Sequence, residues 1–251
     1  MTRIKLTVAY DGSNYVGWQY QPNGMSVQQR LEQALHQLTG AIHRVHSSGR
    51  TDAGVHALGM VCHLVTERDL PLSAWREGLN RFLPDDIAVR QADYVDEEFH
   101  ARFSARGKRY RYTILRDPVR LPLQRKTSWQ VKQRLNVEKM EQAARSFIGQ
   151  HDFAAFRTTG CAAETTAREI FSVTFSEEGS LLHIDICGSG FLKNMVRMMV
   201  GTLVDIGREK RSIETIHSLL EDAGSVPPPL TAPPQGLCLM EVWYPEALRQ
   251  G

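Results

Sequence analysis

The chain has 251 residues, of which 42% are hydrophobic and 23% charged, and its formal net charge is +2. These values exclude a disordered chain and leave room for one large domain or two of ordinary size. The four cysteines lie far apart without a CxxC pair, which argues against a disulfide framework or a zinc site. The N-terminus enters a strand-like pattern at once and no apolar run reaches membrane-spanning length, so we expect a cytoplasmic protein without a membrane partner.

The first hundred residues predict a mixture of strands and helices. Residues 1–10 alternate apolar and polar side chains, which is typical of a half-buried strand. After a loop rich in Gly, Asn and Pro, Ser26 and Gln29 form a capping box at the start of a helix that ends before Gly40. The next expected elements are a strand over 59–66, a helix over 73–82 and a strand over 87–94.

Residues 49–57 read GRTDAGVHA, a stretch that neither helical nor strand periodicity explains. Gly49 and Gly54 allow a sharp turn and the close approach of a substrate. Arg50 offers a phosphate or base contact, and Asp52 is able to act as an acid, a base or a nucleophile. An Asx-type turn, in which Asp52 only caps its own loop, explains the same residues about equally well.

Residues 100–134 carry a strong positive charge. This window holds eleven basic residues and the single acid Asp117, a net charge of +10, so the remainder of the chain sums to −8. A run of charge is often only a solvated face. Here, however, aromatic residues are interleaved, which favours a surface that follows a phosphate backbone and stacks bases. The aromatic residues are Phe99, Phe103, Tyr110, Tyr112 and Trp129.

The second half repeats the order of the first. A strand is expected over 109–115, a helix over 136–148, and strands over 170–175 and 181–187. The first long helices of the two halves are weakly similar in sequence, which predicts two related α+β halves with a boundary near residues 104–108. A cleft between the halves is the natural place for a site.

The helix expected from Phe191 onward is apolar nearly all round, as a buried helix is. One narrow stripe of it is different, because an arginine lies there and a buried guanidinium needs an acidic or phosphate partner. Asp205 on the same helix and Asp52 from another segment are both candidates for that partner. The stripe consists of Lys193, Asn194, Arg197, Gly201 and Asp205.

The C-terminal segment reads as a proline-rich connector followed by a last strand over 237–242. Common catalytic motifs are absent from the sequence, including the GxxxxGK[ST] phosphate loop, HExxH and GxSxG. The histidine spacings do not suggest a metal site either. We therefore expect no metal and no organic cofactor.

The chain resembles the bacterial tRNA pseudouridine synthases A over nearly its whole length. The resemblance lies in VAYDGSNYVGWQYQPN with SVQQRLEQAL, GRTDAGVHA, FHARFSARGKRYRYTI, GFLKNMVRMMVGTLVDIG and APPQGLCLMEVWY. It implies the pseudouridine synthase fold, which is α+β, with two related ferredoxin-like halves around a central antiparallel sheet and a cleft between them. Residues 1–106 then carry the Asp loop, and residues 107–251 carry the Tyr strand and the Arg helix.

The resemblance also implies an activity and a partner. Members of the family isomerise uridines at positions 38, 39 and 40 of the tRNA anticodon arm to pseudouridine, without a cofactor and as homodimers that share one tRNA. The implied catalytic residues are Asp52 as nucleophile or base, Tyr110 stacked on the target base and Arg197 paired with Asp52. The resemblance further implies that Arg50 helps to hold the target nucleotide out of the stack. The implied RNA contacts are Phe99, His100, Arg102, Phe103, Gly160 and Cys161.

Two other functions stay open at this point. An RNA-binding protein of this fold without catalytic activity would keep the basic window, and its behaviour would not depend on Asp52. A hydrolase that uses Asp52 as a base on a small phosphorylated substrate would leave the +10 window unexplained. The sequence also leaves open whether Asp52 attacks C1′ of the ribose, attacks C6 of the uracil, or removes a ribose proton.

Overall fold

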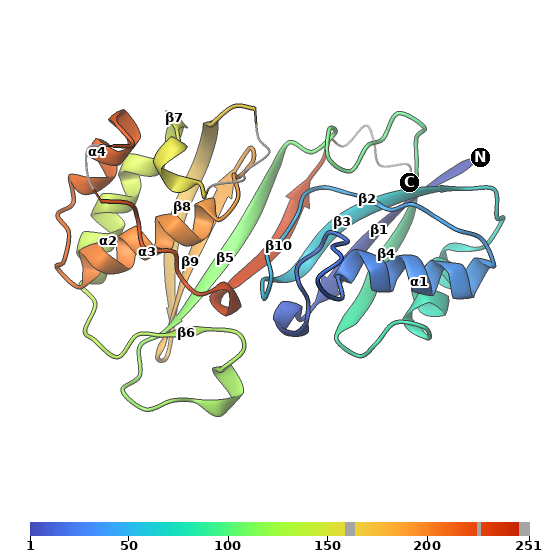
Figure 1. The fold of residues 1–251 in the computed structure, drawn as a ribbon, viewed down its shortest axis with the longest axis horizontal. Coiled ribbons are helices and arrows are strands. Elements are labelled where there is room, and N and C mark those ends of the chain that lie inside the picture. The colour runs from blue at the N-terminus through green and yellow to red at the C-terminus, as the bar shows by residue number, and fades with distance from the viewer. Residues whose placement is uncertain (159–163, 225–226, 246–251) are drawn as a thin grey trace. The chain divides into compact units, whose positions relative to one another are not determined.

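The structure is a computed structural model that describes residues 1–158, 164–224 and 227–245 (Figure 1). It consists of two compact units. The first comprises Met1–Lys108 and Cys238–Gly251, and the second comprises Arg109–Leu237. The chain thus leaves the first unit after Lys108 and returns to it at its end, a return that the predicted division into 1–106 and 107–251 does not include.

The first unit is built on a mostly antiparallel sheet with the strand order β4-β1-β3-β10. The central strand β1 is antiparallel to both β3 and β4, and β10 is parallel to β3. A short strand, β2, adds to β3 in antiparallel orientation. The strands are β1 (Thr2–Tyr10), β2 (His46–Ser47), β3 (His56–Thr66), β4 (Ile87–Val95) and β10 (Leu237–Trp243).

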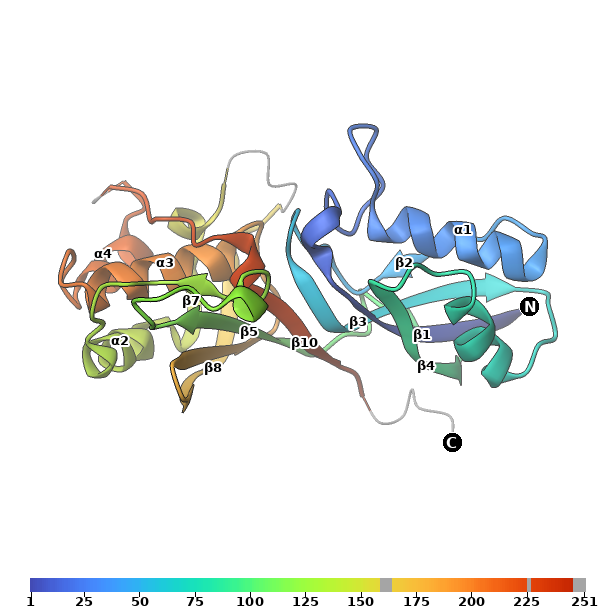
Figure 2. The same ribbon diagram turned by 90° about the horizontal axis from the view of Figure 1, so that it is seen from below.

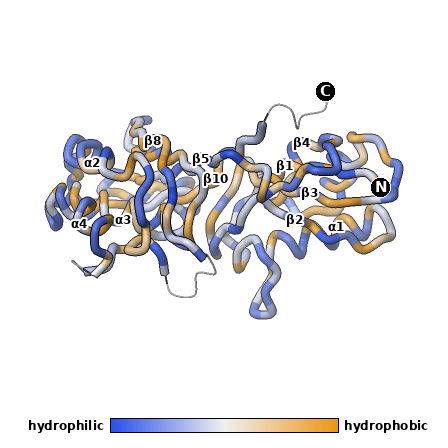
Figure 3. The backbone as a smooth tube through the Cα atoms, turned by 90° about the horizontal axis from the view of Figure 1, so that it is seen from above, coloured by the Kyte–Doolittle hydropathy of each residue, from blue (hydrophilic) through white to orange (hydrophobic). Residues whose placement is uncertain are grey.

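Helix α1 (Val27–Thr39) lies along one face of this sheet (Figure 2). It begins where the sequence predicts, because the Ser26 hydroxyl accepts a hydrogen bond from the Gln29 amide at 3.2 Å. It ends at Gly40, which has the left-handed φ of 70° that favours glycine at a helix C-terminus. Its buried side chains include Leu31 and Leu35, and the tube of α1 accordingly alternates between hydrophobic and hydrophilic colours (Figure 3).

The second unit also combines a mostly antiparallel sheet with helices. The strand order is β5-β9-β8-β7; β8 is antiparallel to β7 and β9, and β6 adds to β5 in parallel. The strands are β5 (Gly107–Leu115), β6 (Trp129–Gln130), β7 (Gly149–Asp152), β8 (Ala167–Glu178) and β9 (Leu181–Gly188). The helices are α2 (Val137–Ala144), α3 (Met195–Gly207) and α4 (Thr215–Glu221).

Helix α3 is the core element of the second unit. All of its residues are buried except Arg197 and Asp205, which confirms the expectation of a buried helix. Of the predicted polar stripe, Lys193 and Asn194 lie before the first residue of the helix. Gly207 allows close packing against α2, since a Cβ atom there would lie 2.6 Å from the sulfur of Met140. The helix begins at Met195 and not at Phe191, because Asn194 has a left-handed backbone conformation that a helix cannot contain.

These two units confirm the predicted α+β class with mostly antiparallel strand pairing. The strands and helices predicted from periodicity are present with shifted ends, and the helix expected over 73–82 contains a π-helical segment, Ala74–Gly78. The elements β2, β6, β7 and α4 are short and are not predicted by the sequence. No helix in the described part of the chain is long and apolar enough to cross a membrane.

Candidate active site

Asp52 lies in the loop between β2 and β3 of the first unit, and it is half-buried. The chain turns directly after it, because the Val55 amide donates a hydrogen bond to the Asp52 carbonyl at 3.1 Å. Gly54 has a φ of 77° within this turn, a value that residues with a Cβ atom rarely adopt. Glycine at position 54 is therefore required by the backbone.

The Asp52 loop is anchored through its neighbour Thr51 to a second segment of the first unit. The Trp18 amide donates to the Thr51 carbonyl at 3.1 Å, and the Thr51 hydroxyl shares a hydrogen bond with the Tyr10 hydroxyl at 2.8 Å. Gly17 has a φ of 112°, and a Cβ atom there would lie 2.6 Å from the Thr51 carbonyl oxygen. The glycine-rich segment after β1 thus fixes the backbone on which Asp52 sits.

The two ends of the loop are held as well. At the C-terminal end of the loop, the Gly12 amide donates to Nδ1 of His56 at 3.1 Å. At the N-terminal end, the Lys108 ammonium donates to the Ser48 carbonyl at 2.8 Å. Arg50 lies between these anchors and is exposed, so its guanidinium faces solvent.

Tyr110 lies on β5 and is buried, with 8% of its surface exposed. Its ring meets the ring of Phe191 edge to face at a centroid distance of 5.2 Å. Tyr112, two residues further on, is also buried and donates its hydroxyl to the Pro233 carbonyl at 2.8 Å. Burial raises the pKa of the Tyr112 phenol, and the charge of Arg197 partly opposes that rise.

Arg197 projects from the first turn of α3 and is one of the two residues of this helix that are not buried. Its Nε donates to the Ala232 carbonyl at 2.7 Å, and its Nη1 donates to Oδ1 of Asn194 at 2.7 Å. Asp205, the candidate partner on the same helix, lies 3.6 Å from Nε of Arg211. Arg197 and Tyr110 belong to the second unit and Asp52 to the first, so their predicted meeting stays a prediction.

The FHARF motif, residues 99–103, folds as a turn in the first unit. Phe99 is 1% exposed, and its ring lies 5.0 Å from that of Tyr244, so this side chain supports the turn from inside. Arg102 is exposed and Phe103 is 76% exposed, with the Arg102 guanidinium 5.6 Å from the centre of the Phe103 ring. The predicted contacts Gly160 and Cys161 lie outside the described residues.

Two histidines shape this turn. Nδ1 of His63 accepts from the Ala101 amide at 3.2 Å, and Nδ1 of His100 accepts from the Arg102 amide at 3.1 Å. The two imidazole rings lie 4.8 Å apart. Burial, together with the neighbouring His100 and His46, lowers the pKa of His63 to about 4, and burial also lowers the pKa of His100. Both rings are therefore neutral at pH 7, as acceptors of backbone hydrogen bonds must be.

This arrangement predicts that acid destabilises the first unit through His63. The folded-state pKa is about 4 and the ordinary value is 6.5, so in this interval the unfolded chain binds a proton that the folded chain does not. The contribution of His63 to stability is therefore complete above pH 6.5 and is lost as the pH falls towards 4. Urea unfolding of wild type and His63→Gln at several pH values tests this. A difference in unfolding free energy that does not change between these pH values would contradict it.

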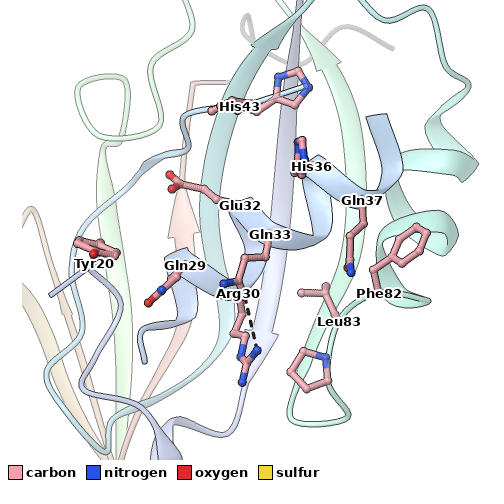
Figure 4. A pocket seen from close by; sticks show the side chains of 12 residues that line it. Tyr20, Gln29, Arg30, Glu32, Gln33, His36, Gln37, His43, Phe82 and Leu83 are labelled. Carbon is pink, nitrogen blue, oxygen red and sulfur yellow. Dashed lines mark hydrogen bonds between the residues drawn. The ribbon is translucent and has the colours of Figure 1, made fainter. Parts of the chain in front are cut away.

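A separate pocket of about 690 Å³ lies in the first unit beside α1 (Figure 4). Its lining combines polar side chains of α1, such as Gln33 and Gln37, with Phe82 and Leu83. Arg30 donates a hydrogen bond to Gln33 at 3.5 Å along this wall. None of the described residues that the sequence predicts for the site lines this pocket. In the described part of the chain, no group of three or more His, Cys, Asp or Glu side chains is arranged to hold a metal ion.

Comparison with known proteins assigns the chain to a family. The family model described as tRNA pseudouridine synthase matches residues 6–104 and 143–245. The chain therefore belongs to the tRNA pseudouridine synthase family, whose members are isomerases.

Individual relatives agree with this family. A protein of Syntrophotalea carbinolica named tRNA pseudouridine synthase A is 55% identical over 97% of this chain and 97% of its own length. A protein of Geobacter sp. (strain M21) with the same name is 53% identical over 98% of this chain and 100% of its own length. A chain in a solved structure, the crystal structure of a Cbf5-Nop10-Gar1 complex, aligns with 80% of this chain and 54% of its own length, at 10% identity and a TM-score of 0.35. That likeness is too low to bear on the fold or the site.

Proposed function

We propose that this chain converts uridines at positions 38, 39 and 40 of the tRNA anticodon arm to pseudouridine. Membership of the tRNA pseudouridine synthase family supports the reaction. The single observation that carries the proposal is the anchored loop around Asp52, which holds a half-buried carboxylate on a backbone with a required glycine and fixed hydrogen bonds. The positions 38 to 40 come from the resemblance of the sequence motifs to the bacterial enzymes.

The reaction breaks the bond from C1′ to N1 and forms a bond from C1′ to C5. The uracil turns in between, N1 gains a proton and C5 loses one, so the reaction is balanced without an added oxidant or reductant. Because the target uridine lies in a structured arm, it must leave the base stack, which costs a few kcal/mol. Phosphate contacts and stacking on an aromatic ring offset that cost.

Each predicted residue has a place in this proposal. Asp52 acts in its ionised form on the ribose or the uracil ring. The guanidinium of Arg197 is its ionic partner and keeps the carboxylate charged, since a nearby positive charge favours the ionised form. Tyr110 stacks on the target base, and Arg50, whose side chain is exposed, helps to hold the nucleotide out of the stack.

The exposed part of the FHARF turn is the proposed RNA surface. Arg102 contacts a phosphate and Phe103 offers a ring for stacking, because these two side chains face solvent. His100 shapes the turn through its backbone hydrogen bonds, and the buried Phe99 supports it. Gly160 and Cys161 are retained as proposed RNA contacts from the sequence resemblance. We also propose a cytoplasmic homodimer on the same basis.

Tritium release tests the proposed activity directly. The substrate is a tRNA transcript whose uridines carry tritium at C5, and bond formation at C5 transfers that tritium to water. We expect the wild-type protein to release tritium from this transcript and not from one in which positions 38, 39 and 40 are cytidine. No release from either transcript, with tRNA still bound, would favour the RNA-binding protein without catalytic activity.

Neutralising Arg102 and Arg106 together is expected to weaken binding to all tRNAs. Both side chains are exposed, so the substitution to alanine removes charge without disturbing the core. The slope of log affinity against log salt concentration should become shallower by about one for each phosphate that the variant no longer neutralises. Filter binding at several salt concentrations measures this slope. Arg76→Ala, which removes an exposed cation that pairs with Glu77, is the control. An unchanged slope in the double variant would mean that these charges only face solvent.

A further inference from the structure

Asn194, the residue before α3, has an unusual backbone conformation. Its φ is 62° and its ψ is 3°, and among the described residues other than glycine only Asn194 and Glu209 have a positive φ. Asparagine tolerates this left-handed conformation better than most residues do. Such conformations persist where the surrounding structure requires them, often at functional sites.

The side chain of Asn194 does not perform the usual task of a residue at this position. An asparagine before a helix normally has an extended backbone and accepts a hydrogen bond from an amide of the first turn. Asn194 makes no such capping hydrogen bond, although its carbonyl accepts from the Met198 amide at 2.9 Å. The amide group is thus available for another contact.

That contact is with Arg197. Nη1 of Arg197 donates to Oδ1 of Asn194 at 2.7 Å, and Nδ2 of Asn194 donates to the Thr158 hydroxyl at 3.1 Å. A guanidinium has only donors, so the amide must present its oxygen to Arg197 and its nitrogen to Thr158. Both ends of the asparagine amide are therefore engaged, and its orientation is fixed.

The guanidinium of Arg197 is held from a second side by the main chain. Its Nε donates to the Ala232 carbonyl at 2.7 Å, and the Ala232 amide donates back to the Arg197 carbonyl at 3.1 Å. The Asn194 amide and the Ala232 carbonyl are both neutral, so they orient the guanidinium without cancelling its charge. The left-handed backbone of Asn194 places its side chain beside the helix turn that carries Arg197.

We propose that Asn194 is a positioning residue that sets the guanidinium of Arg197 in its working orientation. The inference rests on the proposed function, in which Arg197 serves the reacting carboxylate Asp52. It adds to that function a residue that does not touch the substrate and acts only through Arg197. The strained backbone and the missing helix cap are then explained by one requirement, the hydrogen bond to Nη1.

A pair of substitutions separates this role from a purely backbone role. Asn194→Gly removes the amide group and adopts a φ of 62° without strain, whereas Asn194→Ala removes the same group and adds strain. We expect kcat for tritium release to fall about 10- to 100-fold in both variants, because a misplaced catalytic group is costly. KM for tRNA should stay unchanged, and only Asn194→Ala should also lower Tm. Wild-type kcat in Asn194→Gly would overturn the proposal.

A double-mutant cycle tests whether the effect passes through Arg197. In an Arg197→Lys background, Asn194→Gly is expected to change kcat little, since lysine lacks the guanidinium that Oδ1 of Asn194 orients. The same fold-loss in both backgrounds would overturn positioning through Arg197. Failure of the proposed function is distinguishable, because the wild-type protein itself would then release no tritium. Wild-type kcat in Arg197→Lys alone would count against the role of Arg197.

Discussion

Replacement of Asp52 by asparagine is expected to abolish tritium release from tRNA, with a loss of about 1,000-fold or more. Asparagine keeps the shape of the side chain and removes its charge. The anchors of the loop are the Thr51 carbonyl and hydroxyl and the turn at Gly54, none of which changes in this variant. The fold should therefore be kept while the reacting group is lost.

Binding should separate from turnover in the same variant. Affinity for RNA depends mainly on phosphate contacts, so Asp52→Asn should bind tRNA about as well as the wild type does. Asp69→Asn is a matched control, because Asp69 is an exposed acid of the same unit outside the proposed site. Full turnover by Asp52→Asn would remove this carboxylate from the mechanism. A parallel loss of binding and turnover would point to a damaged loop.

Gly17→Ala is expected to lower both stability and turnover. A φ of 112° is strained for alanine at a cost of about 1–3 kcal/mol. The new Cβ atom would also lie 2.6 Å from the Thr51 carbonyl oxygen, so the loop that carries Asp52 must move. For a chain of this size a loss of about 2 kcal/mol corresponds to a fall in Tm of roughly 4–8 °C.

Gly179→Ala separates strain from displacement of the loop. Gly179 also has a positive φ, 57°, but a Cβ atom there would meet nothing within 4 Å. We expect this control to lose stability and to keep full turnover. Thermal unfolding and tritium release on both variants make the comparison. If Gly17→Ala lost stability and kept full turnover, the segment after β1 would not position Asp52.

Much of the fold is predictable from the sequence, because the ends and the burial of a helix depend on residues that lie close together in the chain. Ser26 and Gly40 define the two ends of α1, and the apolar composition of α3 predicts its burial. The start of α3 could not be predicted in this way. The apolar pattern continues from Phe191 through Asn194, whereas the helix begins at Met195 because Asn194 has a left-handed backbone conformation.

The sequence predicts only the local part of the candidate site. Gly49 and Gly54, which flank Asp52 in GRTDAGVHA, predict a turn around this residue, and the turn is present. The hydrogen bonds that anchor Thr51 join segments far apart in the chain, so no local sequence pattern predicts them. The resemblance implies that Phe99 touches RNA, but only 1% of its surface is exposed. The sequence of FHARF does not show which of its two phenylalanine rings packs inward.

We propose above all that this protein forms pseudouridine at positions 38, 39 and 40 of tRNA. The most direct measurement incubates the purified protein with unmodified tRNA transcripts that carry uridine at one of these positions, and then maps pseudouridine at single-nucleotide resolution. We expect pseudouridine at each of the three positions and at no other uridine. Transcripts that remain unmodified, or that carry pseudouridine only elsewhere, would contradict the proposed function.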